Sequence, residues 1–400
     1  MRKRTNAMTG TATQLKRMAM GVAVCLATPF ILVSCGGGGG GGSSSETNFN
    51  IEPLGTQSLS IPEVNDIVAR AVQASISRDV QSTIAITDRV GNVLAVYRMT
   101  NSSPTVIITS GLSGANGRGL DGFTPVPSEL AAIAKAITGA YLSSTGNAFS
   151  TRTASQIVQE FFQPGETGQP SGPLYGVQFS QLPCSDLNVW LSQNATIGPK
   201  RSPLGLSADP GGFPIYQEGR VVGGIGVIAS TDAGTQGVYG LDRDILTNEV
   251  DLEEEIAFAA LPEAFRAPAQ IRANRITANG QTFQFSNTTP AVAGAAALGG
   301  NGNFVAVAGY KTAAGVIAGT SYGTSQSGYV ATTAPAFNGL DTFTLITNPA
   351  DNTSVRFPPS AGGNLTQTEV QNILVEGMKI ANRARAQIRI PLGAAAQVTV

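Results

Sequence analysis

The chain has 400 residues, of which 25 are Lys or Arg and 26 are Asp or Glu, and it contains no histidine. The lack of histidine excludes Ser-His-Asp and Cys-His catalysis, and it excludes zinc sites that use histidine. Five of the 25 bases lie in the first 17 residues, which leaves 20 bases against 26 acids in the rest. This acidic balance argues against nucleic acid as a partner and against binding to an anionic membrane surface through charge.

The N-terminus has the organisation of a bacterial lipoprotein signal. A basic leader precedes an apolar stretch, Met18–Ser34, which is short for a membrane span and is broken by Pro29. The stretch ends in Leu32-Val33-Ser34-Cys35, which resembles the lipobox of bacterial lipoproteins. We therefore expect residues 1–34 to be a signal peptide and Cys35 to be the lipidation site. The mature chain would be exported and held at a membrane by its lipid anchor.

The residues after Cys35 predict a tether. Gly36, and not aspartate, follows the cysteine, and by resemblance to Gram-negative sorting patterns this favours the outer membrane. Seven consecutive glycines and three serines then form a segment that behaves as a flexible coil. We assign residues 35–58 to this tether. With Cys25 in the leader and Cys35 lipidated, Cys184 has no partner for an intrachain disulfide.

The first folded segment, 59–266, opens with an amphipathic helix. Ser60-Ile61-Pro62-Glu63 has the pattern of a capping box with proline in the first turn. The apolar residues that follow share one helical face: Val64, Ile67, Val68, Ala71 and Val72. Further along, the patterns predict strands at 83–87 and 93–97, helices at 128–141 and 153–162, a hairpin at 211–228 and a helix at 251–261.

The hairpin at 211–228 has an unusual second strand, because several glycines interrupt it. Glycines weaken a strand unless a bulge, another backbone or a ligand comes close to it. The pattern therefore marks this hairpin as a place of close approach.

The composition changes at residue 267. Charges almost vanish between Thr277 and Pro349, and Gly, Ala, Thr and Ser dominate from residue 267 to residue 364, which predicts a small β-rich connector. At Thr366-Gln367-Thr368-Glu369 a second capping box appears. It is followed by apolar residues at the same five offsets as in the first helix: Val370, Ile373, Leu374, Gly377 and Met378. With a strand beginning at 397–400, we expect residues 365–400 to be the start of a second, truncated copy in a longer protein.

Three segments carry a family resemblance: LSIPEVNDIVARAV with TIAITDRVGNVLAVYRM, GPLYGV at 172–177, and GGFPIYQEGRVVGGIGV at 211–227. Together they resemble the GlcG/HbpS-like haem-binding family, which also occurs as the C-terminal domain of some corrinoid adenosyltransferases. The resemblance covers 59–261 and begins again at 365. It implies an α+β fold, an antiparallel sheet flanked by helices in a profilin-like sandwich, and assembly into homo-oligomers. The segments 101–124 and 178–209 depart from the family pattern as insertions.

The resemblance also implies a ligand, which would be haem or a related tetrapyrrole or small molecule. Because the chain has no histidine, an iron ligand would have to be Tyr, Met, Cys or a weaker oxygen donor. The candidate ligand-binding residues flank glycine-rich backbone with apolar or phenolic faces: Tyr175, Phe213, Pro214 and Tyr216. No metal ligand is assigned.

Three functions remain open from the sequence. The first is a membrane-tethered binding module that serves haem capture or redox sensing. The second is a surface structural or interaction lipoprotein without a cofactor. The third is an enzyme, for which Asp88, Arg98 and the run Glu253-Glu254-Glu255 are the suggestive charges. Asp88 stands where a turn favours aspartate, and the Glu run has the pattern of a solvated helix face, so no catalytic residue is assigned.

Overall fold

The computed structural model describes residues 57–109, 120–162, 168, 170–175, 197–230, 236–242, 247–340 and 342–383. By its contacts the chain divides into Met1–Asn48 and Phe49–Val400, and every described residue belongs to the second unit. The predicted signal peptide, Cys35, Cys184 and the strand at 397–400 lie outside the described residues. Among the described helices, none is long and apolar enough to cross a membrane.

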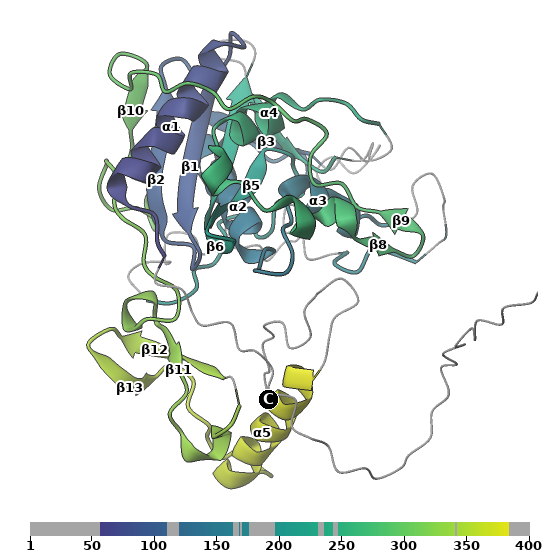
Figure 1. Ribbon diagram of the computed structural model, residues 1–400, viewed down its shortest axis with the longest axis vertical. Coiled ribbons are helices and arrows are strands. Elements are labelled where there is room, and N and C mark those ends of the chain that lie inside the picture. Colours follow the sequence, from purple (N-terminus) through teal and green to yellow (C-terminus); the bar gives the residue numbers. More distant parts are fainter. Residues whose placement is uncertain are drawn as a thin grey trace, which may run out of the picture. The chain divides into compact units, whose positions relative to one another are not determined.

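A five-stranded antiparallel sheet forms the centre of the fold, with the order β10-β2-β1-β6-β5 (Figure 1). Its strands are β1 (Gln81–Asp88), β2 (Val93–Met99), β5 (Gly212–Gln217), β6 (Arg220–Ser230) and β10 (Gly302–Phe304). The predicted α+β class, with an antiparallel sheet flanked by helices, is confirmed.

Helices cover both faces of this sheet. Successive side chains of a strand point to opposite faces, so Ile84 and Ile86 of β1 enter one core and Ala85 enters the other. The first core contains α1 (Ile61–Ile76) and α4 (Leu252–Ala259), and Figure 1 shows α1 lying along β1 and β2. The second core contains α2 (Ser128–Tyr141), whose bounds are those predicted from the sequence.

The glycines of β6 permit α2 to pack closely on the sheet. A Cβ at Gly226 would overlap the carbonyl oxygen of Ala132, and a Cβ at Gly224 would overlap that of Ala136. At these two positions, therefore, the strand contains glycine because the backbone of α2 lies close to it.

A second, three-stranded sheet has the order β4-β3-β7, with β3 (Thr105–Thr109) antiparallel to β4 (Val126–Pro127) and parallel to β7 (Gly237–Gly240). Strand β3 lies within the segment 101–124, which the sequence presented as a polar insertion. The parallel pair β3 and β7 brings Thr109 beside Gly240 at the ends of the two strands.

The capping box predicts the start of α1 correctly, whereas the bounds predicted for two later helices, 153–162 and 251–261, differ from those of α3 and α4. At α1 the Ser60 N–H donates to Glu63 Oε2 at 2.8 Å and the Glu63 N–H donates to Ser60 Oγ at 3.5 Å, which is the predicted capping box. Helix α3 (Thr151–Ile157) stops before the predicted end at residue 162. The carbonyl oxygen of Ile157 accepts a hydrogen bond from the Leu174 N–H instead of continuing the helical pattern.

The domain boundary expected at residue 266 does not separate two folded parts. Phe283 and Phe285 join the first core, and β10 adds an edge strand to the central sheet beside β2. The hydroxyl of Thr320 donates to Asp88 Oδ2 at 2.7 Å. Residues 267–320, which also contain short 3-10 turns and the hairpin β8 (Thr277–Ala278) and β9 (Gln281–Thr282), therefore belong to the first domain.

The remaining described residues form a small sheet and a helix. The sheet has the order β11-β12-β13, with strands Tyr329–Ala331, Phe343–Asn348 and Asp351–Val355, so this part of the expected β-rich connector is indeed β-structured. Helix α5 (Gln367–Arg383) begins with the second capping box, in which the Thr366 N–H donates to Glu369 Oε2 at 2.8 Å. The second copy of the domain stays a prediction.

Candidate functional site

A cavity of about 270 Å³ lies where several elements meet at one end of the second sheet. Thr109 and Gly240, at the ends of β3 and β7, form part of its wall. Asp209 comes from the loop before β5, Arg152 from α3, and Asp251 from the N-cap of α4. Charged side chains from distant parts of the chain thus share one wall.

Lys135 of α2 is fully buried behind this wall. Its ammonium donates to the carbonyl oxygen of Pro210 at 2.6 Å, and it forms ion pairs with Asp209, also at 2.6 Å, and with Glu253. Burial alone would lower the pKa of Lys135, but the nearby carboxylates of Asp209, Glu253 and Asp251 outweigh burial and raise the pKa above its usual value. The lysine is therefore charged at neutral pH.

The two carboxyl groups around Lys135 hold protons more tightly than in water. Burial raises the pKa of Asp209 to about 6, even though Lys135 acts in the opposite direction. Burial also raises the pKa of Glu253, whose Oε1 accepts a hydrogen bond from the Ala229 N–H at 2.6 Å. Lys135 pairs with both carboxyl groups, so this cluster contains two acidic groups and one basic group.

Arg152 forms a second buried charge cluster on the same wall. Its Nε donates to Glu254 Oε1 and its Nη1 donates to Asp242 Oδ2, both at 2.8 Å, and its side chain is only 4% exposed. Glu254 Oε2 also accepts the Asn287 N–H at 3.1 Å. Burial raises the pKa of Glu254 to about 7, against the effect of Arg152.

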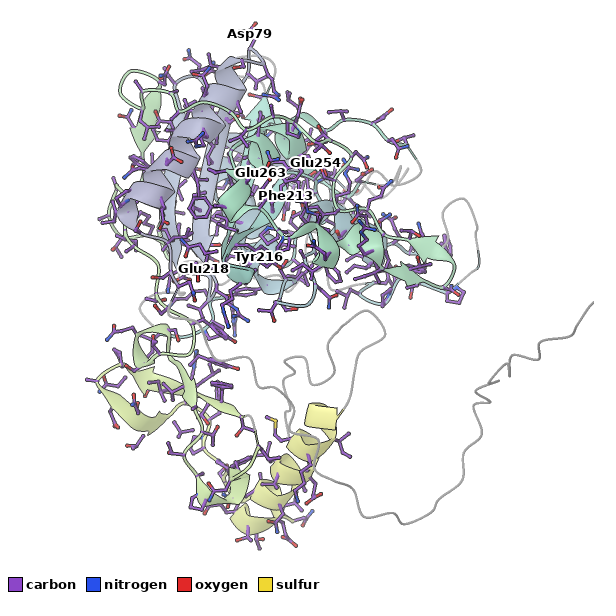
Figure 2. All side chains as sticks on the ribbon, in the orientation of Figure 1. Asp79, Phe213, Tyr216, Glu218, Glu254 and Glu263 are labelled. Atoms are coloured by element: carbon purple, nitrogen blue, oxygen red, sulfur yellow. The ribbon has the colours of Figure 1, made fainter. Side chains whose placement is uncertain are left out.

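Three of the four residues predicted to bind a ligand belong to the core. Phe213 is 1% exposed and its ring stacks on Phe258 with centroids 4.9 Å apart. Tyr216 is equally buried, and its hydroxyl donates to the carbonyl oxygen of Ser144 at 2.7 Å. Pro214 between them is buried too. Figure 2 shows Phe213 and Tyr216 surrounded by other side chains.

These positions correct the prediction for Phe213, Pro214 and Tyr216, because side chains that fill the core present no free face to a ligand. The glycines around them serve helix packing. Tyr175, the fourth candidate, is 50% exposed and does not line the cavity.

The described residues do not fit a haem in this cavity. A pocket for a drug-sized ligand has roughly 300–1,000 Å³ and is mostly apolar, whereas this cavity is smaller and its wall is charged. Two of the possible iron ligands among the described residues, Met99 and Tyr97, are engaged in the core. Met99 is buried and its sulfur accepts the Ser82 N–H at 3.4 Å, while Tyr97 donates its hydroxyl to the carbonyl oxygen of Leu298 at 2.6 Å.

The residues considered for an enzyme do not come together as one site. Asp88 is buried and accepts the N–H groups of Val90 and Asn92, which is the turn role predicted for it. Arg98 pairs with Glu129 at 3.2 Å. Across the described part of the chain, no group of three or more Cys, Asp or Glu side chains could hold a metal ion.

The prediction of a solvated Glu run was wrong. Glu253 pairs with Lys135, Glu254 pairs with Arg152, and Glu255 pairs with Arg78 at 2.8 Å. Sequence reasoning missed this site because the partners come from other elements. One signal was present, however, since Lys135 is a single cation inside an otherwise apolar helical run.

The fold thus defines an α+β protein with an antiparallel sheet between helices and a charged cavity beside it. No family model matches this chain, and no curated protein matches it. Among solved structures it is similar to a PduOC–haem complex, with 20% identity over 51% of this chain and 96% of that chain and a TM-score of 0.28. It is also similar to the Klebsiella pneumoniae protein ORFY of the DUF336 family, with 17% identity, coverages of 52% and 92%, and a TM-score of 0.28. At these values neither similarity assigns the chain to a family.

Proposed function

We propose that this chain is a lipid-anchored binding module for a small polar ligand, and that the cavity between β3, β7, α3 and α4 is its binding site. The observation that carries the proposal is a cavity lined by Asp209 and Arg152, each of which belongs to a charge cluster fixed by burial. Asp209 pairs with the buried Lys135 behind the wall, and Arg152 pairs with Glu254. Buried charges are costly unless they are paired, so a fold that gathers six of them around one cavity gives that cavity a fixed field. A polar ligand benefits from such a field, because little reorganisation is needed when it binds.

Blocking the cavity tests this proposal. Val238 lines it and is 53% exposed, so Val238→Trp would fill the cavity from its solvent side without displacing the core. A matched control is Val355→Trp, at an exposed valine in β13 that does not line the cavity. We expect small polar compounds to raise the Tm of the mature protein and of Val355→Trp, and to have no effect on Val238→Trp. Equal responses of all three proteins would refute a site in this cavity.

Haem is a second candidate ligand, at a different place. The observation that favours it is the phenol of Tyr175, which is half exposed in the segment that closes on the end of α3. A phenolate is an established type of axial ligand for haem iron. Hemin titration of the mature protein should give a saturable Soret band at one haem per chain, and Tyr175→Phe should shift the band and weaken binding. An unchanged band in Tyr175→Phe would remove this residue as the ligand, and the lack of any saturable band would leave haem without support.

The N-terminal sequence pattern supports a proposal for where in the cell the protein lies. We propose that the chain is exported, cleaved before Cys35, lipidated there and held at the outer membrane, and that its folded domain forms homo-oligomers. Mass spectrometry of the mature N-terminus and membrane fractionation of Cys35→Ala test the anchor, and light scattering of the unlipidated domain tests the oligomer. Should neither small molecules nor haem bind, a structural or interaction lipoprotein becomes the better explanation.

A further inference from the structure

We infer that α5 pairs with the α5 of a second copy of this chain, in antiparallel orientation, through a helix face that contains Ile373 and Ile380. The residues that line the cavity come from other elements, so this pairing is independent of the ligand proposed for that site. It assigns a surface to the association between copies.

The first argument is that one face of α5, the yellow helix in Figure 1, is open to solvent. Its positions recur at alternating spacings of four and three residues, as in a helix that packs against another helix: Glu369, Ile373, Glu376, Ile380 and Arg383. Ile373 is 43% exposed and Ile380 is 64% exposed, whereas Val375 on another side of the helix is buried. Two large apolar side chains on the same face thus remain open to a partner.

A groove of about 500 Å³ lies on this face. It is lined by residues of α5 alone: Asn372, Ile373, Glu376, Gly377 and Ile380. Gly377 has no side chain, so the helix surface is hollow between the two isoleucines. Helices that pack side by side insert apolar side chains into hollows of this kind. An isoleucine from a facing helix is therefore a suitable occupant.

The distribution of charge along the face indicates the partner and its direction. Glu369 lies in the first turn of α5 and Arg383 is its last residue. If two α5 helices run antiparallel with Ile373 opposite the partner's Ile380, Glu369 comes within one position of the partner's Arg383. A parallel pair would instead set each charge opposite its own copy, and like charges repel. The charges thus complement each other in the antiparallel pair of two copies.

The middle of such a pair contains Glu376 from both copies. Within α5, Lys379 Nζ lies 2.7 Å from Glu376 Oε1, so each carboxylate has a cation beside it. The side chains of Glu376 and Lys379 are 69% and 44% exposed, and an ion pair this exposed adds little to the stability of the helix alone. Both side chains are free to turn towards a second helix, where two carboxylates and two ammonium groups balance.

A lipid surface suits this face less well than a second helix. Helices that lie on membranes combine a continuous apolar face with a polar face rich in Lys and Arg. In α5 the isoleucines alternate with Glu369 and Glu376, so insertion of this face would bring two carboxylates towards the lipid.

Sedimentation and light scattering of the chain from Gly36 to Val400, which lacks the lipidated cysteine, test the pairing over a wide range of concentrations. We expect a reversible dimer. Ile380→Asp should raise its dissociation constant by about tenfold or more, because a charge then lies in the apolar contact. The matched control is Ile317→Asp, at an isoleucine outside α5 that is 48% exposed, and it should leave the constant unchanged. Circular dichroism checks that both variants keep their helix content.

Cysteine crosslinking in a Cys184→Ser background tests the direction. A mixture of Ile373→Cys and Ile380→Cys chains should form disulfide-linked pairs. Ile373→Cys alone should form few, because in the antiparallel pair the two 373 positions are about 10 Å apart along the helix axis, too far for a disulfide.

Three results would overturn the inference. A chain that stays monomeric at every concentration has no such pair. A dimer that responds equally to Ile380→Asp and Ile317→Asp associates elsewhere, which would leave the proposed homo-oligomer of the folded domain standing without α5. Crosslinking of Ile373→Cys alone as efficient as that of the mixture would exclude the antiparallel pair. Ligand binding in the cavity, measured with Val238→Trp, is unaffected by any of these outcomes.

Discussion

Lys135 stands between Ala134 and Ala136 in α2, and its ammonium lies between the carboxyl groups of Asp209 and Glu253. Removing water from three ionised groups costs free energy, which their mutual attraction and the bond to Pro210 offset. Such clusters contribute little net stability as a whole, yet the loss of one member is severe, because it leaves a buried charge without a partner.

Substitution of the lysine tests this asymmetry. Lys135→Met has similar length and should lower the free energy of unfolding at pH 7 by about 3–5 kcal/mol, measured by urea denaturation, because two buried carboxylates lose their cation. The triple variant Lys135→Met/Asp209→Asn/Glu253→Gln removes all three charges and should recover much of the loss. A triple variant as unstable as Lys135→Met would show that packing, and not charge, is responsible.

Glu254 predicts a pH dependence of stability. Its folded-state pKa of about 7 lies above the usual 4.5, so the folded protein binds this proton more tightly than the unfolded chain. The stabilisation from the bound proton is complete below about pH 4.5 and is lost as the pH rises through 7. We expect the Tm of the wild type to fall over this window more steeply than the Tm of Glu254→Gln.

The control for this measurement is Glu263→Gln, at a carboxylate whose side chain is 76% exposed. It should keep the pH profile of the wild type. A profile of Glu254→Gln that is parallel to that of the wild type between pH 4.5 and 7 would contradict the assigned proton.

At the scale of elements, the contact between α2 and β6 depends on two glycines of β6, which have no side chain. Glycines at 224 and 226 let the backbone of α2 lie against β6. This packing brings Lys135 of α2 within ion-pair distance of Glu253 in α4. Packing of this kind is sensitive to a single methyl group, because a protein interior has little free space.

Gly226→Ala should therefore lower the free energy of unfolding by about 1–3 kcal/mol, since its Cβ would overlap the carbonyl oxygen of Ala132. Gly294→Ala is the matched control, because a Cβ there meets no atom within 4 Å. Chemical denaturation of the two variants measures the difference. Equal stability would mean that α2 can shift away from the sheet at no cost.

The two capped helices show what local sequence can and cannot predict. Both α1 and α5 begin with the predicted capping box, which involves residues only three positions apart. In α1 the apolar face, including Val64 and Ile67, is completely buried. In α5 the corresponding Ile373 is 43% exposed. Whether such a face is covered depends on another part of the structure, and a local pattern does not contain that information.

At the scale of the whole molecule, the segment 267–320 completes the domain. Phe283 and Phe285 are almost fully buried in the first core, and β10 pairs with β2. Truncation of a buried phenylalanine to alanine typically costs about 3–5 kcal/mol. The loss of both phenylalanines with the segment therefore removes a free energy comparable to the whole stability of a typical domain.

A chain comprising residues 57–266 should therefore fail to unfold cooperatively on heating, whereas residues 57–320 should give a single transition. Circular dichroism and hydrogen exchange distinguish the two. Cooperative unfolding of 57–266 with the Tm of the longer chain would restore the domain boundary that composition suggested.

Local features of this protein follow from its amino-acid sequence: the capped helices and the two hairpins depend on periodicity or on residues a few positions apart, and α2 was predicted to the residue. The α+β class was what the family resemblance implied. The tertiary structure decided which charges share a site and which aromatic residues fill the core. Lys135 and Glu253 are 118 positions apart, and Phe213 and Tyr216 are buried because distant elements cover them. Burial and pairing depend on how the elements pack, so only the folded chain shows that the cavity, and not the glycine-rich hairpin, is the candidate site.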